Sequence, residues 1–138
     1  MKLGNSEIKL FYSNWAVREL TELCGGLQNI GKLFNDEEGN LLEAVTMYQN
    51  VIKLVCILAN ANIIKENSEI ALGMRQGDKK EMLDEETLSN VLDMSKASDY
   101  LLECLDVMGL ASKFEMPDGM KMESADVDLE EILEEQNP

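Results

Sequence analysis

The sequence predicts an all-α, mainly helical fold of about five helices, with a short N-terminal strand or arm and a disordered acidic C-terminal tail. Apolar residues recur at three- and four-residue spacing along most of the chain, which is typical of amphipathic helices. Glycines and polar runs separate these periodic segments. The 138 residues, 45% of them hydrophobic, suffice for one domain with a core. We therefore predict a helical domain over residues 1–111, which includes the arm, and the tail over residues 112–138.

The N-terminal segment is expected to lead directly into the first helix. Partial alternation of apolar residues over 7–12 predicts a short strand or an extended arm. Ser13 or Asn14 is then a suitable N-cap, because the side-chain oxygen of either residue accepts a backbone N–H of the first turn. The pair Gly25–Gly26 predicts the end of this helix, since glycine adopts the left-handed conformation that terminates helices.

A second short helix is predicted over residues 27–34, followed by a polar loop over 35–40. Asn40 and Glu43 resemble a capping box, so the longest helix is expected to start there and to run over roughly residues 41–65. Asn67–Ser68 then either ends this helix or caps another short one.

The long helix changes character along its length. Its first half has a polar stripe, which consists of Glu43, Thr46, Asn50 and Lys53. In the same register the second half places Ile57 and Ile64 on that stripe, so the helix becomes apolar nearly all round. It is therefore either the central helix of the fold or a helix that presents apolar surface to a partner. Ile57 and Ile64 are our candidate partner-binding residues on this helix.

Two further helices are predicted after a polar loop at residues 75–80. Asp84 is expected to cap the first, whose first turn carries two glutamates that suit the helix dipole. Ser95 or Ser98 is expected to begin the second, and Gly109 to end it. The predicted core residues are Trp15, Leu20, Leu23, Val51, Val55, Leu58, Leu92, Leu101 and Leu105.

The C-terminal segment from residue 112 onward carries nine acidic residues and two lysines. Such a composition is typical of disordered tails. Leu129, Ile132 and Leu133 lie among its carboxylates, as in segments that fold as a short helix in the groove of a partner. These three residues are therefore candidate partner-binding residues, and the alternative is a tail that serves solubility alone.

The composition argues against most kinds of chemistry. The chain has 27 acidic and 12 basic residues, a net charge of -15 and no histidine. Nucleic-acid binding needs clustered Lys and Arg, and Ser–His or Cys–His nucleophiles need histidine. The three cysteines, Cys24, Cys56 and Cys104, are too far apart for a typical zinc site and odd in number for a disulfide framework. We expect no catalytic residue, no metal site, no cofactor and no enzymatic activity.

The sequence also predicts a soluble cytoplasmic protein. Its most apolar stretch, residues 54–59, is far shorter than the roughly 20 residues of a membrane-spanning helix. Residues 1–12 contain no apolar run of the length found in secretory signals.

The stretch FYSNWAVRELTELCGGLQNIGKLF, residues 11–34, resembles the opening of tail assembly chaperones from long-tailed (siphovirus-type) bacteriophages and prophages. In that family a strand-like segment leads into a helix, a glycine break and a second short helix. The layout is similar over roughly residues 7–110. The residues that carry the resemblance are Ile8, Leu10, Phe11, Trp15, Leu20, Leu23, Gly25, Gly26, Ile30 and Phe34.

The resemblance implies a non-catalytic chaperone that binds the phage tape-measure protein, keeps it soluble and helps to recruit tail-tube subunits. Self-association is a further expectation. The implied location is the host bacterial cytoplasm, and the protein is not retained in the mature virion.

Two other interpretations of the chain are open. One is a different helical interaction factor of a phage or prophage, such as a head–tail connector or a small regulator. The other is an acidic DNA mimic that inhibits a DNA-binding protein, for which the net charge is the motive.

Overall fold

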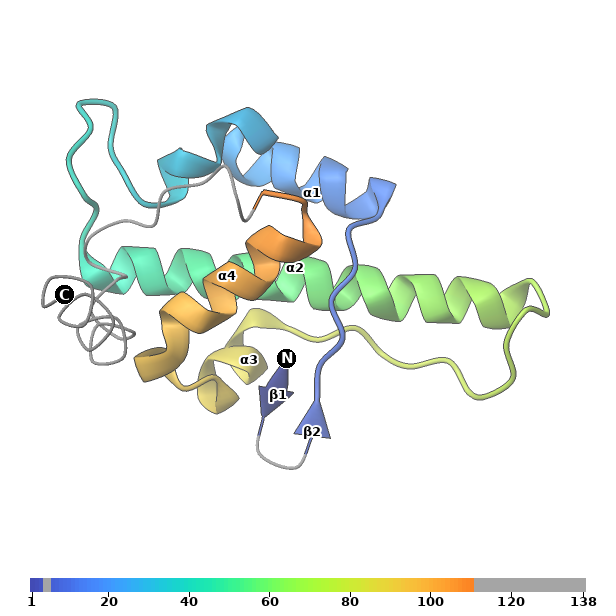
Figure 1. Cartoon of the computed structure of the whole chain (residues 1–138). Coiled ribbons are helices and arrows are strands. Elements are labelled where there is room, and N and C mark those ends of the chain that lie inside the picture. Colours follow the sequence, from blue (N-terminus) through green and yellow to red (C-terminus); the bar gives the residue numbers. More distant parts are fainter. Residues whose placement is uncertain (4–5, 111–138) are drawn as a thin grey trace, which may run out of the picture.

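The computed structural model describes residues 1–3 and 6–110 and confirms the mainly helical fold (Figure 1). The predictions for the tail, including those for Leu129, Ile132 and Leu133, lie outside the described residues. Within the described part, one long helix is surrounded by shorter elements.

The N-terminus forms a small antiparallel hairpin of β1 (Lys2–Leu3) and β2 (Ser6–Glu7). Of the two alternatives predicted for residues 7–12, the structure has the extended arm, and the two short strands lie earlier in the chain. The arm crosses the long helix α2 (Ala44–Ala71), where the backbone N–H of Phe11 donates to the carbonyl of Leu58 at 3.1 Å (Figure 1).

Helix α1 (Asn14–Cys24) begins and ends where the sequence predicts. The Ser13 hydroxyl accepts the backbone N–H of Ala16 at 3.2 Å, which satisfies one N–H of the first turn. Gly25 has a φ of 90°, a left-handed conformation that a side chain would disfavour. A 3-10 helix, η1 (Leu27–Leu33), follows as the predicted second short helix.

The predicted capping box at Asn40 and Glu43 is wrong. The carboxylate of Asp36 accepts the backbone N–H groups of Glu38 and Asn40 at 2.9 Å each, so Asn40 belongs to the closed loop that precedes the helix. Helix α2 begins only at Ala44, after an extended Glu43 whose side chain makes no capping hydrogen bond.

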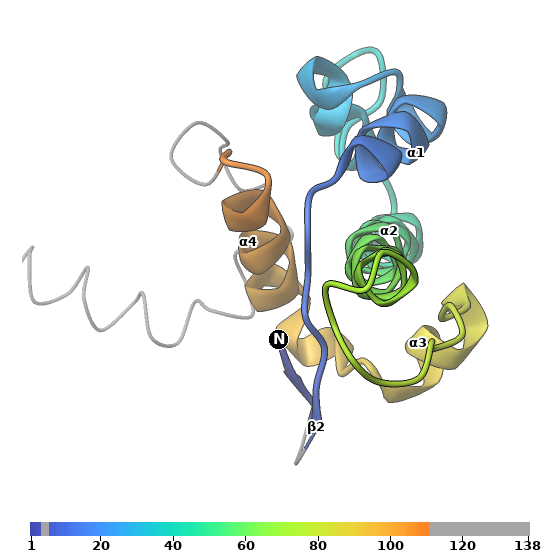
Figure 2. The same cartoon turned by 90° about the vertical axis from the view of Figure 1, so that its right-hand side faces the viewer.

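Helix α2 is the central helix, since α1, α3 (Glu85–Val91) and α4 (Ala97–Val107) all contact it. Figure 2 looks along α2 and shows α4 on one side, with α1 and α3 toward the other. The prediction that Asn67–Ser68 ends it or caps another helix is wrong, because α2 continues to Ala71 before Gly73 turns the chain at a φ of 76°.

Among the described residues, α2 alone has the length and hydropathy of a membrane-spanning helix. Its most apolar window has a mean hydropathy of 1.3, but 61% of that window is buried inside the protein. The core helix of a water-soluble protein has these same properties.

The last two helices confirm one predicted cap and correct one predicted start. The Asp84 carboxylate accepts the Thr87 N–H at 2.7 Å at the start of α3, as predicted. Helix α4 starts at Ala97, neither at Ser95 nor at Ser98, because a 3-10 turn, η2 (Met94–Lys96), leads straight into it.

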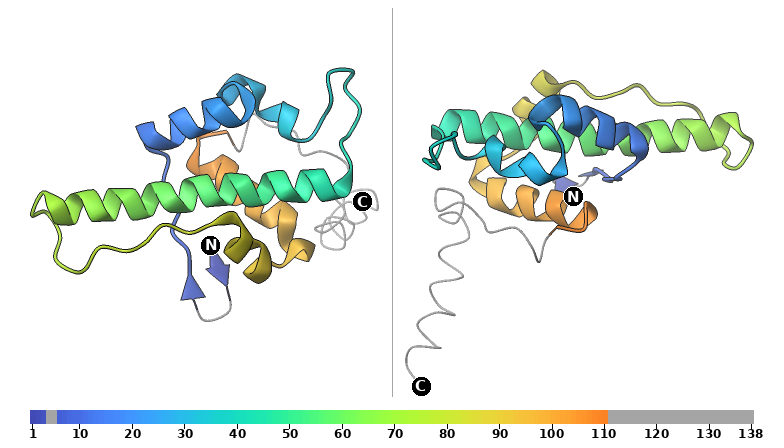
Figure 3. Two further views of the ribbon diagram at one scale, coloured as in Figure 1. Left: turned by 180° about the vertical axis from the view of Figure 1, so that it is seen from behind. Right: turned by 90° about the horizontal axis from the view of Figure 1, so that it is seen from above.

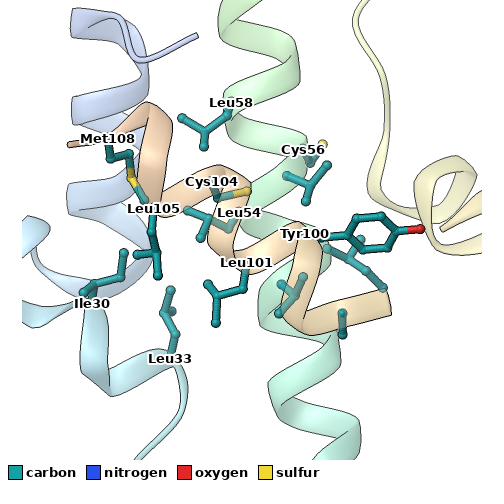
Figure 4. Packing of buried hydrophobic residues seen from close by; sticks show 14 of the residues in the cluster. Ile30, Leu33, Leu54, Cys56, Leu58, Tyr100, Leu101, Cys104, Leu105 and Met108 are labelled. Atoms are coloured by element: carbon teal, nitrogen blue, oxygen red, sulfur yellow. The ribbon is translucent and has the colours of Figure 1, made fainter. Parts of the chain in front are cut away.

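The core lies mainly between α2 and α4, with Ile30 and Leu33 of η1 at its side (Figure 4). Seven of the nine predicted core residues are buried: Leu20, Val51, Val55, Leu58, Leu92, Leu101 and Leu105. Trp15 and Leu23 are only half-buried at the edge of the core. Both therefore keep surface that the core does not use.

Candidate functional site

An open groove of about 390 Å³ lies between α1, α2 and residues 82–85, on the side of α2 away from α4 (Figure 2). Figure 3 (left) views this face, with α2 lying between α1 and the chain segment that leads into α3. We call it the acidic groove. It is lined by Trp15, Glu19, Glu22, Leu23, Lys53, Cys56, Ile57, Asn60, Met82 and Glu85.

Helical spacing accounts for two sides of the acidic groove. The lining residues of α1 lie within positions 15–23, and those of α2 lie at positions 53, 56, 57 and 60. Each set follows the three- and four-residue spacing of one helix face. The first and last residues of the α2 set are seven positions apart, which is about 10 Å or two helical turns.

The other wall, residues 82–85, depends on a buried asparagine. Asn60 is 4% exposed, and its side-chain amide makes two hydrogen bonds with the backbone of Leu83. Its Nδ2 donates to the Leu83 carbonyl at 2.8 Å, and its Oδ1 accepts the Leu83 N–H at 2.7 Å. The amide thus pairs with Leu83 as the backbone of a neighbouring strand would.

Asn67 repeats this arrangement with Lys80. Its Nδ2 donates to the Lys80 carbonyl at 2.8 Å, and its Oδ1 accepts the Lys80 N–H at 2.9 Å. The two asparagines are seven helical residues apart, about 10 Å along α2. Residues 80 and 83 are three extended residues apart, also about 10 Å. Because the spacings match, both pairs form at once and hold residues 80–83 along α2.

The acidic groove carries unbalanced negative charge. Glu19, Glu22 and Glu85 line it with one lysine, Lys53, and Arg18 lines a smaller adjoining pocket together with Glu19 and Glu22. Among residues 1–3 and 6–110, neither the three glutamates nor Lys53 forms an ion pair. Glu85 accepts a hydrogen bond from the Gln49 amide at 3.4 Å.

The thiol in the acidic groove is not activated for nucleophilic chemistry. Burial raises the pKa of Cys56, the carboxylates of Glu85 and Asp84 raise it further, and the Asn60 amide opposes them. The thiol therefore stays protonated at neutral pH, whereas a reactive cysteine is a thiolate. In the part of the chain that the structure describes, no group of three or more Cys, Asp or Glu residues has the arrangement to hold a metal ion.

The structure separates the predicted partner-binding residues. Ile57 lies in the acidic groove and is half-buried, beside Trp15 and Leu23. Ile64 is also half-buried but lies two turns further along α2 and does not line the groove. That these residues bind a partner stays a prediction.

Sequence reasoning missed Met82 and the three carboxylates of the acidic groove. Met82 is 52% exposed and lines the groove next to Leu83, which Asn60 holds against α2. A signal was nevertheless present: Asn60 and Asn67 stand seven residues apart on one face of an apolar helix, where a polar side chain needs a partner.

The comparisons with known proteins do not assign the chain to a family, since no protein-family model, curated protein or solved structure matches it. An open groove that combines apolar side chains with charged ones is suited to binding another molecule.

Proposed function

We propose that this protein is a non-catalytic tail assembly chaperone of a long-tailed bacteriophage or prophage. It binds the tape-measure protein, keeps it soluble in the host bacterial cytoplasm, and helps to recruit tail-tube subunits around it. It is not retained in the mature virion.

The acidic groove is the observation that carries the proposal. Trp15 and Leu23 belong to the residues that resemble the chaperone family, and both line the groove, where Ile57 and Met82 add apolar surface from other elements. A chaperone that prevents aggregation needs such apolar surface on a stable framework. The net charge of -15 supports solubility while that surface is open.

Co-expression with the tape-measure protein of the same phage genome tests the proposal. We expect most of the tape-measure protein to appear in the soluble fraction with this chain, and in the pellet without it. An equal soluble amount in both cases would contradict the proposed function.

A matched pair of double variants tests whether the groove is the chaperone surface. Ile57→Ala with Met82→Ala removes apolar contacts from the groove and should return tape-measure protein to the pellet. Val45→Ala with Leu72→Ala removes residues that are 78% and 74% exposed outside the groove, so solubility should be unchanged. Urea unfolding of both variants checks that each is folded. Met82→Glu is a further variant for the case that Ile57→Ala destabilises the fold, because Met82 is largely exposed.

A further inference from the structure

We infer that the acidic groove binds about two turns of a cationic amphipathic helix of a partner protein. The apolar side chains of that helix contact Trp15 of α1, Ile57 of α2 and Met82 of the opposite wall, and its Lys and Arg residues face Glu19, Glu22 and Glu85. The inference rests on the proposed function, since it names the chemical class of client segment that the site takes.

The dimensions of the acidic groove suit a helix. Its floor follows α2 for about 10 Å, the rise of seven helical residues. Helix-in-groove binding uses anchors at positions i, i+3 or i+4, and i+7, which is the same length. Figure 3 (left) shows α1 on one side of the middle part of α2 and the chain segment that leads into α3 on the other. A guest helix in the groove would therefore lie alongside α2.

The apolar part of the groove is already arranged in the unbound protein. Trp15 and Ile57 are half-buried against the core, which fixes their positions and leaves one side of each open. Met82 is 52% exposed at the opposite wall, and a flexible thioether adapts to varied guests. Burial of these three side chains by the guest supplies the favourable apolar contact.

The charges select the class of guest. Three groove carboxylates form no ion pair among the described residues, and Lys53 is the single cation of the lining. Basic side chains on either edge of a guest helix would meet these carboxylates at a partly desolvated rim.

The same charges argue against two other occupants. The tail from residue 112 onward has nine acidic residues and two lysines, so it is repelled by the rim. A second copy of the chain carries a net charge of -15, so like-charge repulsion disfavours it as the occupant of an acidic groove.

A designed peptide tests the inference directly. The probe is two heptads of Leu and Lys in amphipathic order, with a Leu and Glu peptide of the same pattern as the charge control. Trp15 is the single tryptophan of the chain and lines the groove, so its fluorescence reports binding at this site. We expect saturable binding of the Lys peptide in about 0.1 M salt, much weaker binding in about 1 M salt, and none of the Glu peptide.

Charge-matched variants separate the groove from the general acidity of the chain. Replacing Glu19, Glu22 and Glu85 with Gln should weaken binding of the Lys peptide about tenfold. Replacing Glu37 and Glu38 with Gln and Asp106 with Asn changes the net charge equally at exposed sites outside the groove, and should change affinity less than about twofold. Equal effects of both triple variants, or binding without any change in Trp15 fluorescence, would overturn the inference.

Further measurements separate the inference from the proposed function. If the Lys peptide binds in the groove but the tape-measure protein stays insoluble, the function fails and the inference holds. If the tape-measure protein is solubilised but the peptide does not bind, the inference fails and the function holds. Two other results also overturn the inference. The first is a dimer in light scattering that is lost when Glu19, Glu22 and Glu85 are replaced with Gln, which would make a second copy the occupant of the groove. The second is peptide binding that appears only after removal of residues 112–138, which would make the tail the occupant.

Discussion

The pairing of Asn60 with Leu83 yields the sharpest stability prediction. Asn60→Ala removes both hydrogen bonds between the Asn60 amide and the Leu83 backbone, at 2.7 and 2.8 Å, and leaves the Leu83 carbonyl with the Cys56 thiol at 3.6 Å. An intramolecular hydrogen bond contributes about 0.5–1.5 kcal/mol, and groups left unpaired away from water cost more. Because Leu83 is half-buried, water replaces only part of the loss. We therefore expect Asn60→Ala to lower the free energy of unfolding by about 2 kcal/mol.

Asn67→Ala is the matched control, because it removes the same two bonds at a more exposed place. Water can satisfy the freed Lys80 backbone, so the expected cost is below about 1 kcal/mol. With a urea dependence of about 1–3 kcal/mol per molar, the unfolding midpoint should fall by about 1 M in Asn60→Ala and by less than half of that in Asn67→Ala.

Hydrogen exchange locates the effect residue by residue. The Leu83 amide lies outside every helix, yet it should be protected in the wild type because Asn60 Oδ1 accepts its hydrogen. Asn60→Ala should remove protection at Leu83, and Asn67→Ala should remove it at Lys80. Rapid exchange of Leu83 in the wild type, or an unchanged urea midpoint in Asn60→Ala, would refute the reasoning.

Three further predictions concern single side chains. The Ser98 hydroxyl is buried and has no hydrogen-bond partner among the described residues. Ser98→Ala should therefore raise the free energy of unfolding, measured by urea titration, by about 1 kcal/mol. A lower stability of the variant would contradict this, because it would mean that the hydroxyl has a hydrogen-bond partner. The hydrogen bond from the backbone N–H of Thr87 lowers the pKa of Asp84. The ionised Asp84 carboxylate therefore stabilises the fold above the ordinary Asp pKa of about 3.9, and this stabilisation is lost as the pH falls through the folded pKa. Asp84→Asn keeps a capping side chain that does not titrate, so the wild type should be more stable than the variant at pH 7 and equally stable near pH 2; a stability difference that does not change with pH would contradict this prediction. Burial raises the pKa of the Cys104 thiol, whereas Cys24 is only half-buried. In the folded protein a thiol reagent should therefore label Cys24 before Cys104, as detected by mass spectrometry. Equal labelling of the two cysteines would contradict the burial of Cys104.

Local signals in the sequence predicted those parts of the fold that local physics determines. Ser13 and Asp84 cap their helices because a short polar side chain beside an apolar periodic run has few better partners. Gly25 ends α1 because it adopts a positive φ at little cost. The capping box at Asn40 failed because Asp36, four residues earlier, engages the Asn40 N–H in the loop. Sequence spacing does not reveal which of two neighbouring acceptors a backbone N–H meets.

The candidate site was predicted only in part, because it depends on contacts between distant residues. Ile57 was identified from the apolar register of α2, which is a local pattern. Met82 lies on the acidic groove through the pairing of Leu83 with Asn60, 23 residues away along the chain. Trp15 was predicted as core, but an apolar residue at the edge of a core and one at its centre have the same periodicity.

The paired asparagines of α2 also bear on how the chain tolerates change in length. Because residues 80 and 83 are fixed to α2 at two points, the register of that segment does not depend on the number of residues in the turn before it. The intervening residues 72–79 are all exposed, at the end of α2 that projects past α1 and α4 (Figure 1). This turn is therefore the place for inserting an affinity tag or a fluorescent label, and sequences that differ in its length would keep the same groove.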